Sequence, residues 1–249
     1  MNDRHDSYNE DFYSRQMDGS YKSAQIVAEH LNSYYQPKEI VDVGCGRGTW
    51  LKAFKELGVQ KLVGLDGSWN SQTDMVDEDI VFQQEDLNNP SSIAIEKRYD
   101  MAISLEVAEH LEPEGSVGFV ALLTALSDVV LFSAAFNKQG GKDHINERLH
   151  SCWAEEFAKY GFRPYDLFRP VFWGNPDVRF WYQQNCFLYV KEGSDLAGKL
   201  ASMGQHPLTN LAFMNCIHPR LYARYTKPPA LTRLKTKIKK RMGQQEDNK

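Results

Sequence analysis

Cysteine is scarce in this chain of 249 residues, which has four: Cys45, Cys152, Cys186 and Cys216. None of them forms a Cys-x-x-Cys pair or a cluster typical of a disulfide framework, so we predict free thiols in a reducing compartment. Long apolar runs are also missing. No stretch approaches the roughly 18 consecutive apolar residues of a membrane span, and the first residues lack the apolar core of a secretion signal. We therefore expect a cytoplasmic protein.

An excess of basic residues is missing as well. Lys and Arg number 29 against 33 Asp and Glu, which gives a net charge of −4. Such a balance excludes a general attraction to nucleic acid or to an anionic membrane, so a partner of either kind would need a local patch. The segment from Pro228 onward is one candidate for weak membrane-surface contact, although a solvated terminal helix is the interpretation we favour. Its basic side chains surround an apolar helical face formed by Leu231, Leu234, Ile238 and Met242.

A glycine-rich stretch organises the chain. Glu39–Val43 is a β-branched, apolar run, three glycines follow it at positions 44, 46 and 48, and residues 51–57 are apolar at helical spacing. This order predicts a strand, a tight loop and a helix. Glycine lets the backbone turn sharply and lets a ligand come close. The Gly-x-Gly-x-Gly spacing is one residue shorter than the dinucleotide fingerprint, which favours a nucleoside without phosphates.

Residues 41–48, Val-Asp-Val-Gly-Cys-Gly-Arg-Gly, resemble the first motif of class I S-adenosylmethionine (SAM)-dependent methyltransferases. The resemblance extends from about residue 13 to residue 192 through an ordered set of later stretches. In that family the glycine loop passes under the methionine part of SAM. The resemblance therefore implies that SAM is the cofactor, with contacts at Asp42, Gly44, Cys45, Gly46 and Gly48.

The fold class follows from alternating strand and helix patterns. Further strands are predicted at 61–66, 80–84, 99–105 and 129–134, with helical segments between them, and the last two at 163–169 and 185–190. This alternation indicates an α/β protein with a parallel, doubly wound sheet. The resemblance implies a Rossmann-like, seven-stranded sheet with helices on both faces and a final hairpin. We expect an N-terminal arm and helix over the cofactor edge (1–35), the methyltransferase domain (36–192) and a C-terminal helical extension with a basic tail (193–249).

Acidic residues at two strand ends complete the expected cofactor site. Asp66 ends the second strand, where a carboxylate can accept hydrogen bonds from a ribose diol, with Gly67 beside it; a simple Asp-Gly turn is the alternative. Asp86 follows the third strand, and the resemblance implies a bond to the adenine amine, with Leu87 lining the base pocket. An Asp that caps a turn would look similar. Leu105, at the end of the fourth strand, is a further expected contact.

The chemistry is expected at Glu106, Glu109, His110 and His144, because two strand ends bring these residues to one edge. Glu106 and Glu109 are three residues apart and share a face if their turn is helical. Two carboxylates and two imidazoles are suitable ligands for Mg²⁺ or Mn²⁺, which can lower the pKa of an acceptor hydroxyl. Without a metal, His144 or His110 would be the general base and Glu109 would orient it. The sequence leaves both alternatives open.

This Glu-x-x-Glu-His pattern with a later His resembles the metal-dependent small-RNA 2′-O-methyltransferases. Similar stretches occur in small-molecule methyltransferases without a fixed metal, and residues 131–185 resemble bacterial methyltransferase-domain proteins of glycan or natural-product pathways. We therefore expect O-methylation of a small or carbohydrate-like acceptor, and nucleic acid is a less favoured partner. The alternatives are an RNA-terminal 2′-O-methyltransferase with a divalent metal and a non-catalytic SAM-binding regulatory module.

Overall fold

The computed structural model describes residues 10–226, with side chains from residue 19 onward. The first nine residues and the basic tail from Pro228 lie outside the described residues, so the hypothesis about the tail stays a prediction. The helices are α1 (Glu10–Asn32), α2 (Thr49–Glu56), α3 (Ser116–Leu126), α4 (His150–Ala158), α5 (Arg169–Phe172), α6 (Phe180–Asn185), α7 (Asp195–Ser202) and α8 (Pro219–Tyr225). Short 3₁₀ turns are η1 (Gln72–Asp74), η2 (Pro90–Ser92), η3 (Ala108–His110), η4 (Pro113–Gly115) and η5 (Leu211–Asn215).

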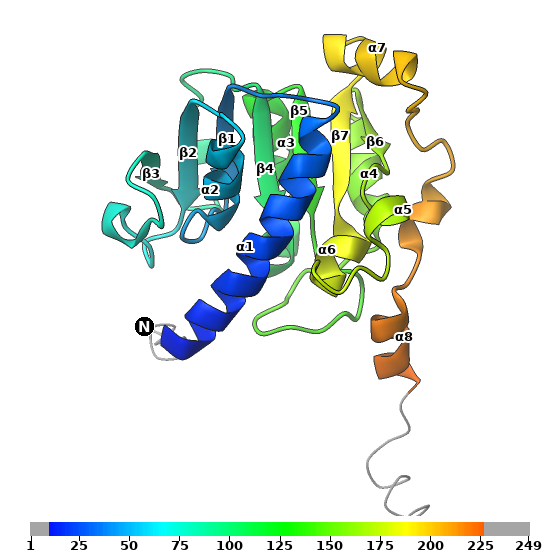
Figure 1. Cartoon of the computed structure of the whole chain (residues 1–249), viewed down its shortest axis with the longest axis horizontal. Helices are drawn as coiled ribbons and strands as arrows, with labels where there is room; N and C mark the ends of the chain where they lie inside the picture. Colours follow the sequence, from blue (N-terminus) through cyan, green and yellow to red (C-terminus); the bar gives the residue numbers. More distant parts are fainter. Residues whose placement is uncertain (1–9, 227–249) are drawn as a thin grey trace, which may run out of the picture. The chain divides into compact units, whose positions relative to one another are not determined.

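The sheet has seven strands in the order β3-β2-β1-β4-β5-β7-β6 (Figure 1). They are β1 (Glu39–Val43), β2 (Lys61–Asp66), β3 (Ile80–Gln84), β4 (Met101–Leu105), β5 (Val129–Ser133), β6 (Phe162–Tyr165) and β7 (Phe187–Lys191). The first five strands pair in parallel, and β7 pairs antiparallel to both β5 and β6. The predicted doubly wound α/β fold with a terminal antiparallel pair is confirmed.

Helices cover both faces because successive strand residues point to opposite sides. In β1, Ile40 packs with the buried faces of α1 and α2, whereas Val41 packs with α3 and α4. Both faces of the central strands are therefore apolar, as buried parallel strands require. The largest side chains on the α3 and α4 side of the sheet, including Trp153, are almost fully buried. This packing fixes the carboxyl ends of β1, β2, β4 and β5 along one edge.

Contacts divide the chain into two units, Met1–Cys216 and Ile217–Lys249. The sheet and all the predicted site residues belong to the first. In the second, Pro219 occupies the first turn of α8, and Nδ1 of His218 accepts a hydrogen bond from the backbone N–H of Arg220 at 3.2 Å. Within residues 10–226, no helix is both long and apolar enough to cross a membrane.

Two local predictions were wrong. The segment 1–35 was interpreted as an arm followed by a helix, but α1 already begins at Glu10, so most of that segment is helical. Residues 166–169 and 185–186 lie outside the last strands, and Asn185 instead ends α6. The aromatic run before Asn185 fits a short helix as well as a strand, since periodicity cannot distinguish the two over so few residues.

Candidate functional site

The glycine loop between β1 and α2 adopts a conformation that L side chains rarely reach. Gly44, Gly46 and Gly48 have φ angles of 89°, 53° and 80°. A Cβ at Gly44 would lie 2.3 Å from a methyl of Val107, so that glycine is required for packing. At Gly46, by contrast, no described atom lies within 4 Å of the Cβ position. The loop therefore presents bare backbone toward open space, which fits the cradle expected for SAM.

Asp66 ends β2 directly beside this loop and is 5% exposed. Its Oδ2 accepts the backbone N–H of Gly46 at 2.7 Å and the amide of Asn70 at 3.2 Å. Its Oδ1 accepts the N–H of Gly67 at 2.7 Å. Burial raises the pKa of Asp66, and these donors oppose that effect. Trp69 is a further side-chain donor to this carboxylate, so a ribose hydroxyl would share its acceptor positions with these donors.

Asp42 and Cys45 lie beneath the loop rather than on its open side. Asp42 is 3% exposed, and burial followed by the charge of Asp66 raises its pKa well above the ordinary value. The thiol of Cys45 is directed toward Gly64, where a Cβ would lie 2.6 Å from the sulfur. Burial raises the pKa of this thiol, so it is unreactive. Both side chains are therefore buried beside the loop rather than exposed on it.

The expected adenine region has a mixed geometry. Asp86 is exposed and its Oδ1 accepts the N–H of Asn88 at 3.1 Å, so it caps a turn. Leu87 and Leu105 are buried at the edge of the sheet. Trp69 is 59% exposed, and its ring lies so close to Gly67 that a Cβ there would be 2.3 Å from it. An open aromatic face therefore lies next to Asp66, and no sequence pattern had indicated it.

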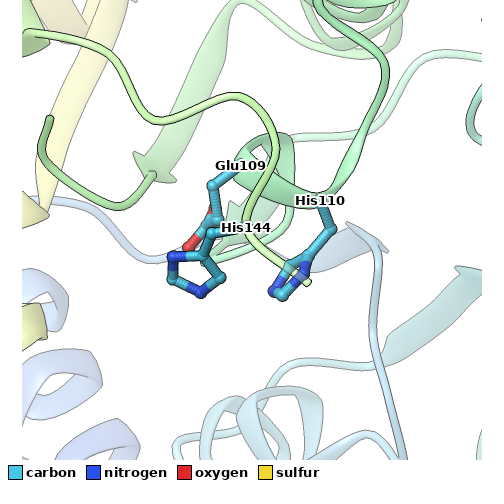
Figure 2. Close-up of side chains that lie close together, drawn as sticks. All are labelled: Glu109, His110 and His144. Atoms are coloured by element: carbon cyan, nitrogen blue, oxygen red, sulfur yellow. The ribbon is translucent and has the colours of Figure 1, made fainter. Parts of the chain in front are cut away.

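Glu109, His110 and His144 converge at the ends of β4 and β5 (Figure 2). One potential ligand atom from each lies within 4.8 Å of the others. Glu109 is 0% exposed, and neither carboxylate oxygen makes a well-formed hydrogen bond with the described residues, although the backbone of Ala135 and the carboxyl of Glu106 lie close enough to affect its pKa. Burial, and then the charge of Glu106, raise its pKa well above the ordinary value. A buried carboxylate in this condition costs free energy unless a proton or a cation accompanies it.

Both histidines are held through Nδ1. The Nδ1 of His144 lies 2.8 Å from Oε1 of Glu147, and that oxygen also accepts the N–H of Gly140 at 2.7 Å. The Nδ1 of His110 lies 3.3 Å from the carbonyl oxygen of Asp143. An Nδ1–H that donates to oxygen leaves the lone pair on Nε2, the form that binds metals or accepts protons. The rings meet edge to face with centroids 4.8 Å apart.

Glu106 has a different environment from the one predicted. Its φ of 56° places it in the left-handed region, so it does not share a helical face with Glu109, and the short turn η3 begins only at Ala108. It is outside the Glu109–His110–His144 group. Its carboxylate instead accepts the amide of Asn185 at 3.0 and 3.2 Å and that of Gln139 at 3.4 Å.

Backbone strain concentrates at this site. Between residues 10 and 226, three non-glycine residues have a positive φ: Glu106, Lys138 and Asp143. All three lie in the two segments that carry the candidate catalytic side chains. Such conformations cost of order 1–3 kcal/mol each and persist where the surroundings enforce them, typically at functional sites. Glu147, Gln139 and Asn185 were missed from the sequence because their contacts arise only after the chain folds.

Comparison with solved structures agrees with this fold. An O-methyltransferase family protein from Burkholderia thailandensis matches with a TM-score of 0.56 and 10% identity, over 77% of this chain and 61% of that one. This chain thus spans less than two thirds of that protein. The methyltransferase in a Haloferax volcanii complex with the Trm112 activator matches at 0.56 and 15%, over 76% and 98%. Magnesium protoporphyrin IX methyltransferase from Synechocystis PCC 6803, solved with SAM, matches at 0.50 and 18%, over 70% and 80%.

The sheet order, the glycine loop and the acid at the end of β2 define a Rossmann-like domain of the methyltransferase type. The sequence profile of a methyltransferase domain family matches residues 13–115, which contain the glycine loop, Asp66 and the Glu106–His110 segment. Residues 13–115 are therefore similar to a methyltransferase domain, and the seven-stranded sheet has the fold of the solved methyltransferases. A search of curated proteins found no match to the chain.

Proposed function

We propose that this protein transfers the methyl group of SAM to a hydroxyl oxygen of a small or carbohydrate-like acceptor, with a divalent cation at the acceptor site. The observation that carries the proposal is Glu109. Its fully buried carboxylate makes no well-formed hydrogen bond within the described residues and lies beside the Glu106 carboxyl and two imidazoles that present Nε2. Carboxylate oxygen suits Mg²⁺ or Mn²⁺, and two imidazole ligands favour Mn²⁺ of the two.

The cofactor would lie along the carboxyl edge of the sheet. Gly46 offers open backbone to its amino-acid part, Asp66 offers Oδ1 to its ribose and Trp69 offers an aromatic face to its base. Asp86 has one carboxylate oxygen that caps the turn, so an adenine contact would use the other. Stacking on an aromatic ring contributes of the order of 1 kcal/mol beyond the buried area.

The reaction needs positioning and removal of one proton. An acceptor oxygen attacks the methyl carbon in line with the sulfur, an O–C bond forms, and the C–S bond breaks with its electron pair going to sulfur. The hydroxyl proton leaves to a base or to solvent. Correct placement of the two reactants can supply several kcal/mol of the barrier. Without a bound cation, Nε2 of His144, with its tautomer fixed by Glu147, would be the base that accepts the proton.

Glu109, His110 and His144 would hold the cation, with Glu106 adjacent. When bound, such an ion lowers the pKa of a coordinated hydroxyl and stabilises the alkoxide. The buried carboxyl of Glu109 gives the ion its negative partner, and the two histidines supply neutral nitrogen ligands. A small acceptor is supported by the net charge of −4, which gives no general attraction to RNA.

Calorimetry and turnover together test the proposal. Asp66→Ala should abolish binding of S-adenosylhomocysteine, whereas His144→Ala should retain binding and lose methyl transfer from labelled SAM. The acceptor panel would contain monosaccharides, vicinal diols and a short RNA with a free terminal diol. Full activity in EDTA would contradict the metal, methylation of the RNA alone would contradict the acceptor class, and binding without turnover on any acceptor would favour a regulatory module.

A further inference from the structure

A buried network of side-chain amides surrounds Glu106. Asn185 at the end of α6 is 1% exposed, and its Nδ2 lies 3.0 and 3.2 Å from the two carboxylate oxygens of Glu106. The same Nδ2 lies 3.1 Å from Oε1 of Gln139. Its Oδ1 accepts Nε2 of Gln184 at 3.0 Å and lies 3.1 Å from Nε2 of His150. Side chains from α6 and the loop after β5 therefore meet on one carboxylate, and His150 of α4 contacts the far end of the Asn185 amide.

The orientation of the Gln139 and Asn185 amides in this network is fixed by their hydrogen bonds. A backbone N–H can only donate, and that of Phe136 donates to Oε1 of Gln139 at 3.2 Å. This bond fixes which end of the Gln139 amide is oxygen, so its Nε2 is directed to Glu106. Because Oε1 of Gln139 can only accept a hydrogen bond, the Asn185 atom 3.1 Å from it must be the donor Nδ2. Both amide nitrogens consequently face the carboxylate, and a flipped Asn185 would place oxygen against oxygen.

Glu106 is also constrained from its backbone. Its N–H lies 3.0 Å from the carbonyl oxygen and 3.1 Å from Oγ of Ser133 in β5. These bonds stabilise the left-handed backbone conformation of Glu106, which is otherwise unfavourable for a non-glycine residue. Glu106 lies near enough to His144 and Glu109 for their charges to interact. Asn185 uses one acceptor position on each carboxylate oxygen and Gln139 uses a second on Oε2, so a ligand would bind through Oε1.

We propose that Asn185 is a positioning residue of the acceptor site, which acts by holding the Glu106 carboxylate toward Glu109 and His144. The proposal rests on the proposed function in assigning a cation to that site. Groups that orient a ligand from behind typically change metal affinity by 10- to 100-fold when they are lost. By fixing the Glu106 carboxylate, Asn185 would allow Glu106 to be a fourth protein ligand of the cation. Glu106 lies outside the group of Glu109, His110 and His144 in this structure.

The matched control is Gln183, a neighbouring buried amide of the same helix. Its side chain bonds the backbone of Gly174, Asn175 and Val178 at 2.6–2.7 Å and is not bonded to Glu106 in the described contacts. Asn185→Leu and Gln183→Leu each remove one buried amide, but only the first releases Glu106. If Asn185→Leu fails to fold, Gln139→Met removes the other amide donor and serves in its place.

The test is Mn²⁺ titration of the full chain by electron paramagnetic resonance, with calorimetry of S-adenosylhomocysteine as the control for an intact cofactor edge. Asn185→Leu should weaken Mn²⁺ binding by about 10- to 100-fold, and Gln183→Leu should leave it unchanged. In a Glu106→Gln background Asn185→Leu should add nothing, because it acts through Glu106. Equal affinities for the two leucine variants, or an undiminished effect in that background, would overturn the proposal.

Failure of the cation proposal gives a different result. The wild-type protein would then bind no Mn²⁺, and crystal structures of the metal-free Asn185→Leu and Gln183→Leu variants would decide the positioning role. Displacement of the Glu106 carboxylate in the first variant alone would support the proposal. A carboxylate that keeps its position in both would refute it.

Discussion

Replacing Glu109 with methionine should stabilise the metal-free protein, and Mn²⁺ should narrow or reverse that gain. In the metal-free protein Glu109 is 0% exposed, and its carboxyl oxygens make no well-formed hydrogen bond within residues 19–226. Leaving such a group buried costs about 1–3 kcal/mol. Methionine has a similar length and no polar group, so Glu109→Met should raise the Tm by roughly 2–12 °C for a chain of this size.

Mn²⁺ should narrow or reverse this difference. A ligand at 100 times its Kd stabilises the folded state by about 2.7 kcal/mol, and the variant lacks the carboxylate ligand that would bind it. Differential scanning fluorimetry in EDTA and in graded Mn²⁺ measures both effects. Glu112→Met, at an exposed acid of the same segment, is the control and should change neither. The reasoning fails if Glu109→Met is the less stable protein in EDTA, or if Mn²⁺ raises both Tm values equally.

Three further predictions concern Gly46 in the glycine loop, the buried His150 and the tautomer of His144. Gly46 and Gly58 both have a positive φ and open space at the Cβ position, so alanine at either should cost about 1–2 kcal/mol of stability. Only Gly46→Ala should also weaken S-adenosylhomocysteine binding in calorimetry. Equal binding by the two variants would contradict a cofactor site at the glycine loop. Burial lowers the pKa of His150 to about 4. The unfolded chain therefore takes up a proton near pH 6.5 and the folded chain only near 4, so the free energy of unfolding should fall by about 3 kcal/mol as the pH drops through that window. Denaturant titrations at a series of pH values should show that the free energy of unfolding of His150→Gln depends less on pH in this window than that of the wild type. An unchanged pH dependence would refute the assignment. Glu147→Gln should make the Nε2–H form of His144 populated in ¹⁵N NMR spectra, whereas a retained Nδ1–H tautomer would show that Glu147 does not set it.

The sequence was informative wherever a residue type has a local physical reason. Gly44, Gly46 and Gly48 were predicted to make a sharp loop, and all three have a positive φ. The five parallel strands and the final antiparallel pair follow from apolar runs whose length and spacing suit a buried sheet. These features depend on short-range backbone sterics and on periodicity, which a single sequence records directly.

The candidate site was only partly predictable. The sequence indicated that Glu109, His110 and His144 would meet, because strand ends converge on one edge, and they do lie together. It did not indicate that Glu106 would take a φ of 56° and bond Asn185, a residue 79 positions away in the sequence. Contacts of this kind depend on how α6 packs against the loop after β5. No periodicity encodes them, and the expected helical face for Glu106 was wrong for that reason.

The most direct test is a crystal structure of the protein grown with S-adenosylhomocysteine and Mn²⁺, with diffraction recorded at a wavelength where manganese scatters anomalously. We expect an anomalous peak bounded by Glu109, His110 and His144, with the nucleoside across Gly46 and its ribose on Asp66. A nucleoside bound elsewhere, or a peak absent from that cluster when the cofactor is in place, would contradict this expectation.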